Sequence, residues 1–87
     1  MNTYPLKISS PDGDLFNDNI VAFFVRGVEG DLAVLAGHIP FITTVKECEC
    51  KIEYDNGDIK KAAIGGGLLT VSENETTLLL SKLEWKE

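Results

Sequence analysis

The stretch RGVEGDLAVLAGHIP, residues 26–40, is the most informative part of this sequence for the fold. Its centre, residues 31–36, is a short apolar run between two turns that contain glycine. An apolar run of this length between turn residues is typical of a β-strand and is too short for a helix. Glycine permits backbone angles that other residues avoid, so we expect a rigid turn on each side of the strand. We expect both turns to lie at the same end of the molecule, where loops can present binding residues.

The segments before and after this stretch have the same β character. Most of them alternate polar and apolar residues or are rich in β-branched residues, and no long window carries apolar residues at helical spacing. Besides residues 31–36, the predicted strands are residues 4–9, 15–16, 19–26, 41–46, 51–54, 59–64, 68–71 and 76–83. Asn56 and Gly57 predict a type I′ hairpin turn between two of them. About eight to ten short strands predict an all-β fold, a flattened β-sandwich or closed barrel, because both shield strand edges.

Length and charge restrict the possible functions. The chain of 87 residues has room for a single domain, residues 1–87. It has 14 acidic and 8 basic residues, a net charge of −6, and the sequence shows no basic face that would bind nucleic acid through its phosphates. The N-terminus does not have the pattern of a secretory signal, and the longest apolar stretch, residues 20–25, is far shorter than the roughly 20 residues that span a bilayer. We expect a soluble cytoplasmic protein without membrane insertion.

Residues 20–25, IVAFFV, break the alternation expected of a strand with one wet face, because both of its faces are apolar. One explanation is that a neighbouring loop covers the strand. The other is that its outer face, which carries Ala22 and Phe24, contacts another protein, since contiguous apolar surface often marks an interface.

The sequence offers few groups for catalysis or metal binding. Its single histidine, His38, could form a zinc site together with Cys48 and Cys50. However, Cys-x-Cys without a second ligand cluster is a weak zinc signal, and an extended strand suits a disulfide poorly, so we expect two reduced thiols. Residues 65–67, three glycines, precede a β-like segment, which favours a close strand approach over a phosphate-binding loop. We expect no catalytic residue, no metal and no cofactor.

Several motifs, in order and at matching spacing, resemble the epsilon subunit of F-type ATP synthases, which is called delta in mitochondria. Residues 28–32 and 37–40 are similar to the family's Glu-Gly-Glu-Leu-Gly and Pro-Gly-His-x-Pro motifs. Residues 65–71, GGGLLTV, are similar to its Ser-Gly-Gly-x-Leu-Glu-Val segment, and residues 6–16 to its opening strand and turn. The resemblance extends over nearly the whole chain and implies the family's flattened β-sandwich.

The sequence also departs from the family pattern. Arg26 stands where the family commonly has Pro or Thr, and Ala33 where it has Gly. Ala36 replaces a usual Pro and Gly65 a usual Ser. Phe24 takes a position that is often polar in the family, which again suggests a surface that faces a partner or a second copy. The family's C-terminal helical hairpin, which by resemblance inhibits ATP hydrolysis and in some bacteria binds ATP, does not follow the sandwich in this sequence.

The resemblance implies a non-catalytic rotor subunit of the central stalk, held against the gamma subunit and seated on the polar loops of the c-ring. Such a subunit couples ion translocation to ATP synthesis, as a peripheral protein at the cytoplasmic face of the inner (plasma) membrane, with no small-molecule substrate. The residues expected on the c-ring side are Glu29, Asp31, His38, Ile39 and Pro40, and those on the gamma side are Ala22 and Phe24. Two alternatives remain: a free-standing β-sandwich adaptor derived from this fold, and a small metal or redox protein that uses the cysteines and the histidine.

Overall fold

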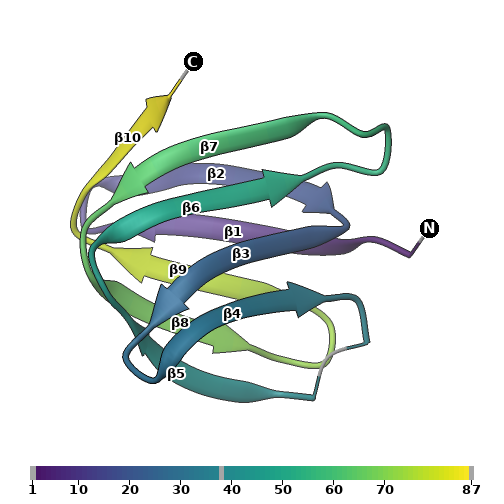
Figure 1. Cartoon of the computed structure of the whole chain (residues 1–87), viewed down its shortest axis with the longest axis horizontal. Coiled ribbons are helices and arrows are strands. Elements are labelled where there is room, and N and C mark those ends of the chain that lie inside the picture. Colours follow the sequence, from purple (N-terminus) through teal and green to yellow (C-terminus); the bar gives the residue numbers. More distant parts are fainter. Residues whose placement is uncertain (1, 38, 87) are drawn as a thin grey trace.

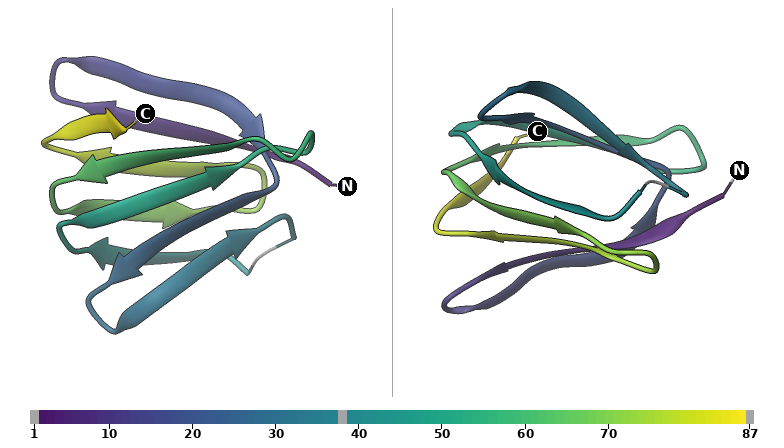
Figure 2. Two further views of the ribbon diagram at one scale, coloured as in Figure 1. Left: turned by 45° about the horizontal axis from the view of Figure 1, so that its top comes forward. Right: turned by 90° about the horizontal axis from the view of Figure 1, so that it is seen from below.

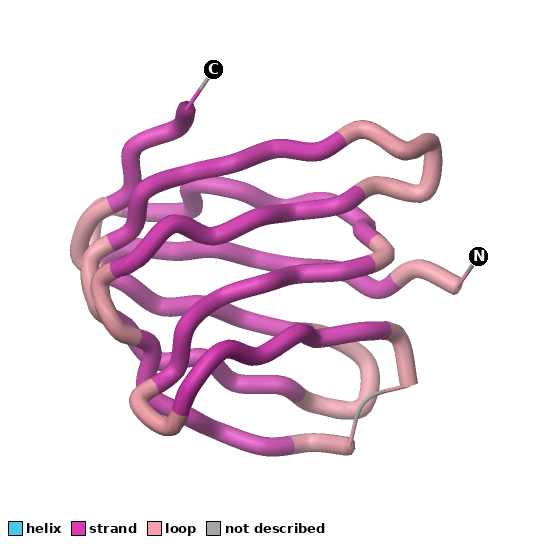
Figure 3. Tube along the Cα trace, in the orientation of Figure 1, coloured by secondary structure: helices cyan, strands magenta, loops and turns pink. Residues whose placement is uncertain are grey.

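The structure is a computed structural model that describes residues 2–37 and 39–86, and these residues form β-strands and the turns between them (Figures 1 and 3). In chain order the strands are β1 (Tyr4–Ser10), β2 (Gly13–Ile20), β3 (Ala22–Gly27), β4 (Gly30–Leu35), β5 (Phe41–Val45), β6 (Cys48–Glu53), β7 (Ile59–Ile64), β8 (Gly67–Val71), β9 (Thr76–Leu80) and β10 (Leu83–Lys86). The all-β prediction is confirmed.

The strands form one continuous path of hydrogen-bonded neighbours that folds into two layers. The path runs β10-β7-β6-β3-β5-β8-β9-β1-β2, and β4 pairs with β3 beside it. The first layer contains β10, β7, β6, β3 and β4, and the second layer contains β5, β8, β9, β1 and β2 (Figure 2). All the pairs are antiparallel except that of β1 with β9. The result is the nearly closed, barrel-like β-sandwich predicted from the sequence.

The two layers are joined differently on their two sides. On one side the backbone continues the pairing, because Gly27 of β3 pairs with Val45 of β5. On the other side β2 and β10 are the two ends of the path, and side chains close the gap between them. There the rings of Phe16 and Trp85 lie 5.7 Å apart, and the Lys60 ammonium lies 4.5 Å from the centre of the Trp85 ring. The sandwich is therefore held by hydrogen bonds at one side and by an aromatic contact at the other.

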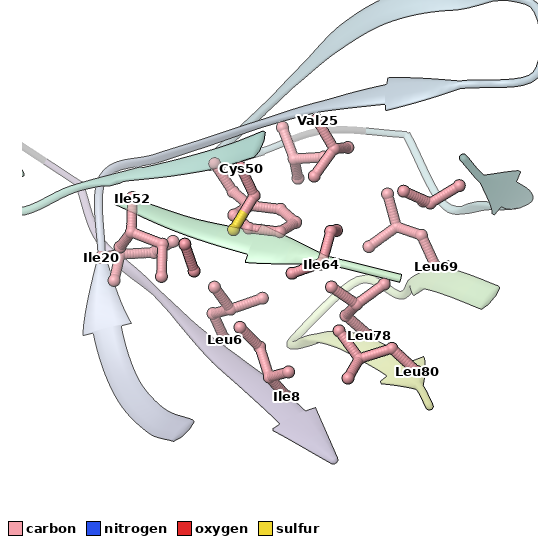
Figure 4. Packing of buried hydrophobic residues seen from close by; sticks show 14 of the residues in the cluster. Leu6, Ile8, Ile20, Val25, Cys50, Ile52, Ile64, Leu69, Leu78 and Leu80 are labelled. Carbon is pink, nitrogen blue, oxygen red and sulfur yellow. The ribbon is translucent and has the colours of Figure 1, made fainter. Parts of the chain in front are cut away.

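The core lies between the layers and is filled by alternate residues of nearly every strand (Figure 4). Its buried members are Leu6, Ile8, Ile20, Phe23, Val25, Val34, Val45, Cys50, Ile52, Ala62, Ile64, Leu69, Val71, Leu78 and Leu80. Burying one large apolar side chain stabilises a fold by about 1.5–3 kcal/mol, so this cluster is the main source of stability.

Two predicted strands are each divided in the structure. Residues 19–26 are split because β2 ends at Ile20, Val21 forms a bend and β3 begins in the other layer. The Val21 N–H donates a hydrogen bond to the Glu53 carbonyl oxygen (2.9 Å), which fixes the crossing. Residues 76–83 are likewise split into β9 and β10. β2 is also much longer than the two residues predicted, because it is an edge strand whose side chains are mostly exposed and so lack a clear alternation.

Glycines at two turns show what the local sequence could and could not predict. A side chain at Gly67 would clash with the backbone carbonyl oxygen of Leu79, so the predicted close strand approach at residues 65–67 is confirmed. The turn at Asn56 and Gly57 is not type I′, which needs a positive φ at both residues, because only Gly57 has one (91°). The Gly57 N–H donates to the Tyr54 carbonyl (3.1 Å), as in a type I turn followed by a glycine bulge.

Candidate functional site

The described residues among those expected on the c-ring side lie at opposite ends of β4. Glu29 lies in the turn between β3 and β4 and Asp31 is the second residue of β4, whereas Ile39 and Pro40 follow β4 at its other end (Figure 1 shows both ends of β4). β4 has six residues, so the two turns are separated by roughly 17–20 Å of strand. The expectation that both turns share one end is therefore wrong, because the two turns that flank a single strand must lie at its two ends. His38 lies outside the described residues.

The β3–β4 turn is an exposed, well-anchored projection. The Val28 N–H donates to the Thr44 carbonyl oxygen (3.1 Å), and the Lys46 N–H donates to the Arg26 carbonyl oxygen (2.9 Å), so the base of the turn is tied to the end of β5 and to the residue that follows it. Arg26 Nε donates to Asp31 Oδ1 at 2.8 Å, and this hydrogen bond raises the pKa of the arginine. Gly30 has a φ of 126°, which a side chain would strain. The turn thus presents acidic groups on a fixed backbone.

The opposite end of the sandwich is acidic and partly apolar. Ile39 is 79% exposed there, and Pro40 beside it is also exposed. The Tyr4 hydroxyl donates to the Val34 carbonyl oxygen (2.5 Å) and so ties β1 to β4, and burial raises the pKa of this tyrosine. The turns at this end carry the acidic residues Asp55, Asp58, Glu73 and Glu75.

The outer face of β3 exposes less apolar surface than the sequence suggests. Ala22 is only 5% exposed, so it contributes almost nothing to a surface. Phe24 is half-buried, and the Lys51 ammonium lies 4.7 Å from the centre of its ring. Phe23 and Val25 point into the core. Of the two residues expected on the gamma side, Phe24 alone is accessible to a partner.

A larger apolar surface, which sequence reasoning missed, lies on the outer face of the second layer. We call it the leucine face, and its members are Ile42, Thr44, Leu68, Thr70, Thr77 and Leu79. Leu68 pairs directly with Leu79 across β8 and β9, and Ile42 pairs with Thr70 across β5 and β8. Ile42, Leu68 and Leu79 are 67%, 42% and 51% exposed. The sequence did contain a sign of this surface. Consecutive leucines in β8 and β9 place apolar residues on both faces of these strands, as the apolar run does at β3.

The two cysteines lie on one strand but in different surroundings. Cys50 is fully buried with its sulfur in the core (Figure 4), and burial raises the pKa of its thiol to about 11. Cys48 is half-buried, and both are free thiols. Within residues 2–37 and 39–86, no group of three or more His, Cys, Asp or Glu residues could hold a metal ion.

Comparison with known proteins gives a consistent match over almost the whole chain. A family model described as "ATP synthase, Delta/Epsilon chain, beta-sandwich domain" matches residues 3–86. The sodium ion specific ATP synthase epsilon chain of Acetobacterium woodii is 38% identical over 98% of this chain and 64% of its own length. The ATP synthase epsilon chain of Bacillus velezensis is 34% identical over 100% of this chain and 65% of its own length. This chain thus spans less than two thirds of the length of either relative.

Solved structures with the same fold include chains of two mitochondrial ATP synthases. A chain of the Euglena gracilis enzyme, solved as OSCP/F1/c-ring, superposes with a TM-score of 0.89 at 22% identity and covers 95% of this chain and 53% of its own. A chain of the Tetrahymena thermophila central stalk/c-ring structure has a TM-score of 0.78 at 13% identity and covers 94% of this chain and 66% of its own. At these identities the likeness supports the β-sandwich fold alone.

Proposed function

This chain belongs to the delta/epsilon family of ATP synthase chains, whose β-sandwich domain matches residues 3–86, and we propose its function on that basis. In this proposal the chain is a non-catalytic rotor subunit of the central stalk. It links the gamma subunit to the c-ring and so couples ion translocation to ATP synthesis. The family match carries the proposal, and the names of the relatives and of the solved assemblies support it.

The leucine face is the proposed contact with the gamma subunit. It is an uncharged surface over three adjacent strands, in a chain where a quarter of all residues are charged. Burial of apolar surface is worth about 25 cal/mol per Å², so covering its three large side chains supplies more affinity than the exposed charges can. The sequence predicted this contact at Ala22 and Phe24. Because Ala22 is buried, only Phe24 could contribute to a contact on that face.

The β3–β4 turn is the proposed contact with the c-ring. Glu29 in the turn and Asp31 at the start of β4 are exposed and can pair with basic or amide groups of the ring loops. Exposed pairs of this kind contribute about 0–1 kcal/mol each, so they set orientation more than affinity. Ile39 and Pro40 lie at the other end and precede β5, which carries Ile42, so we assign them to the gamma side. The role predicted for His38 stays a prediction.

The proposed location is peripheral, on the cytoplasmic face of the membrane that carries the ring. In the described part of the chain, no helix has the length and apolar character needed to cross a bilayer. The proposal assigns the chain no catalytic residue, cofactor or small-molecule substrate, and its role is to hold two partners together.

Size-exclusion chromatography with the gamma subunit of the same organism tests the proposal. We expect stable one-to-one co-elution of this chain with gamma. Failure of two folded proteins to co-elute would contradict the stalk role and favour the alternative, a β-sandwich adaptor with a different partner.

A further inference from the structure

The outer face of the first layer carries a hollow that the proposed stalk contacts leave open, except that Asp31 at its edge belongs to the proposed c-ring contact. It has a volume of about 580 Å³ and lies over β3, β4 and the start of β6. Phe24 and Ala33 are apolar residues of its lining that belong to the outer face, and Arg26, Asp31, Glu47, Glu49 and Lys51 are its charged lining residues. We call it the Phe24 hollow. Because it lies on the other layer from the leucine face, both surfaces can be occupied at the same time.

The floor of the hollow is built from paired positions on two strands. Phe24 pairs directly with Ala33, and Arg26 pairs with Asp31 in the next row. Ala33 places a small side chain beside the Phe24 ring, and the Lys51 ammonium lies 4.7 Å from the centre of that ring. The hollow therefore offers an aromatic surface with a cation beside it.

A row of lysines extends from the hollow across the first layer. Lys51 of β6 pairs directly with Lys61 of β7, and Lys61 pairs with Lys86 of β10. Like charges at directly opposite positions destabilise a sheet, yet this acidic chain places three of its eight basic residues there. Lys86 is paired with Glu49 at 2.6 Å. Within residues 2–37 and 39–86, neither Lys51 nor Lys61 forms an ion pair.

We propose that the Phe24 hollow and the adjoining lysine row bind an acidic segment of a partner protein that carries one large apolar side chain. The apolar side chain covers Phe24 and Ala33, and the carboxylates reach Lys51 and Lys61. A segment with separated charges suits the site, because its carboxylates can reach Lys51 and Lys61, whereas a dense polyphosphate is repelled by Glu47 and Glu49, which line the same hollow. This inference goes beyond the proposed stalk function and does not depend on it.

The test is an NMR titration of the intact chain with the short acetylated peptide Glu-Asp-Leu-Glu-Asp, with Gln-Asn-Leu-Gln-Asn as its uncharged control. The chain has a net charge of −6 and repels an acidic peptide unless a local site attracts it. We expect amide shift changes confined to β3, β4, β6 and β7 for the acidic peptide, and none for the control. The affinity should fall as salt is added.

Variants of Lys51 and Lys61 then test whether these two lysines bind the peptide. The double variant Lys51→Gln and Lys61→Gln should weaken peptide binding about fivefold or more, and the matched pair Lys51→Arg and Lys61→Arg should retain it. Lys7→Gln, on the outer face of the second layer, is the control for a simple loss of charge and should have no effect. Unchanged binding by the double glutamine variant, or no shift change in the hollow at all, would overturn the proposal. So would stronger perturbation of the same residues by pyrophosphate or by phosphatidylglycerol vesicles.

Discussion

The outer faces of the two layers are built on the same alternation of strand residues but offer different chemistry. The leucine face carries three exposed aliphatic side chains and three threonines, without charge. The outer face of the first layer carries Phe24 among four basic residues, Arg26, Lys51, Lys61 and Lys86, and four acidic ones, Asp31, Glu49, Glu53 and Glu84. The difference indicates that one face can bind through apolar burial, whereas the other must select a partner with matching charges.

The largest expected effect is on stability. It distinguishes the core from the outer faces, because neighbouring residues of similar size point to opposite sides of the same strand. Phe23→Ala and Leu78→Ala remove fully buried side chains and should lower the free energy of unfolding by about 2–5 kcal/mol. Phe24→Ala and Leu79→Ala, one position further along, should cost about 1 kcal/mol or less, because these side chains lie on the outer faces. Urea unfolding measures all four variants. Equal costs within either pair would mean that the outer residue supports the fold and is not a binding surface.

The next largest expected effect is on affinity for the gamma subunit, and it compares a new charge in the leucine face with one on the outer face of β3. Leu68→Asp or Leu79→Asp places a charge in the leucine face and should weaken gamma binding about ten- to a hundredfold, which co-elution and calorimetry can measure. Phe24→Asp should leave gamma binding within about twofold. If folded Phe24→Asp loses gamma and folded Leu79→Asp retains it, the contact lies on the β3 face, as first predicted from the sequence.

A smaller effect comes from Cys50, which lies on the inner side of the first layer. Burial raises the pKa of its thiol from 9.0 to about 11, so the folded state favours the neutral thiol. Above about pH 9 the unfolded chain ionises this group and the folded chain does not, so stability that is complete below pH 9 should be lost toward pH 11. The expected loss is about 1–2 kcal/mol. Urea unfolding near both pH values should show a steeper decline for the wild type than for Cys50→Ala, and equal declines would refute the buried-thiol effect.

The smallest effect concerns the ion pair at the rim of the hollow. Arg26 and Asp31 are both exposed, so Asp31→Ala should leave the thermal midpoint and gamma binding unchanged within error. The same variant should alter contact with the c-ring if the β3–β4 turn lies there, which ion-coupling assays of the assembled enzyme can detect. Loss of gamma binding by Asp31→Ala would place the gamma contact at this turn.

Much of the fold could be predicted because its signals are local. Alternating apolar residues in β1, β6 and β7 predicted strands, and the glycines at residues 65–67 predicted a close approach that the backbone of Leu79 confirms. The ordered motifs of residues 28–40 predicted the family. The exposed edge strand β2 was underestimated because a strand without a buried face shows no alternation.

The sequence by itself determined that this chain is all-β, which residues form most of its strands, and to which family it belongs. Only the tertiary structure decided which face of an apolar strand is buried. In runs such as residues 22–25 and 78–80, consecutive apolar residues make both faces alike, so packing against the opposite layer selects the inner one. The structure also placed Glu29 and Ile39 at opposite ends of β4, and it grouped Ile42, Leu68 and Leu79 from three strands into one surface. Residues far apart in the chain become neighbours through strand pairing, and a local pattern carries no record of that pairing.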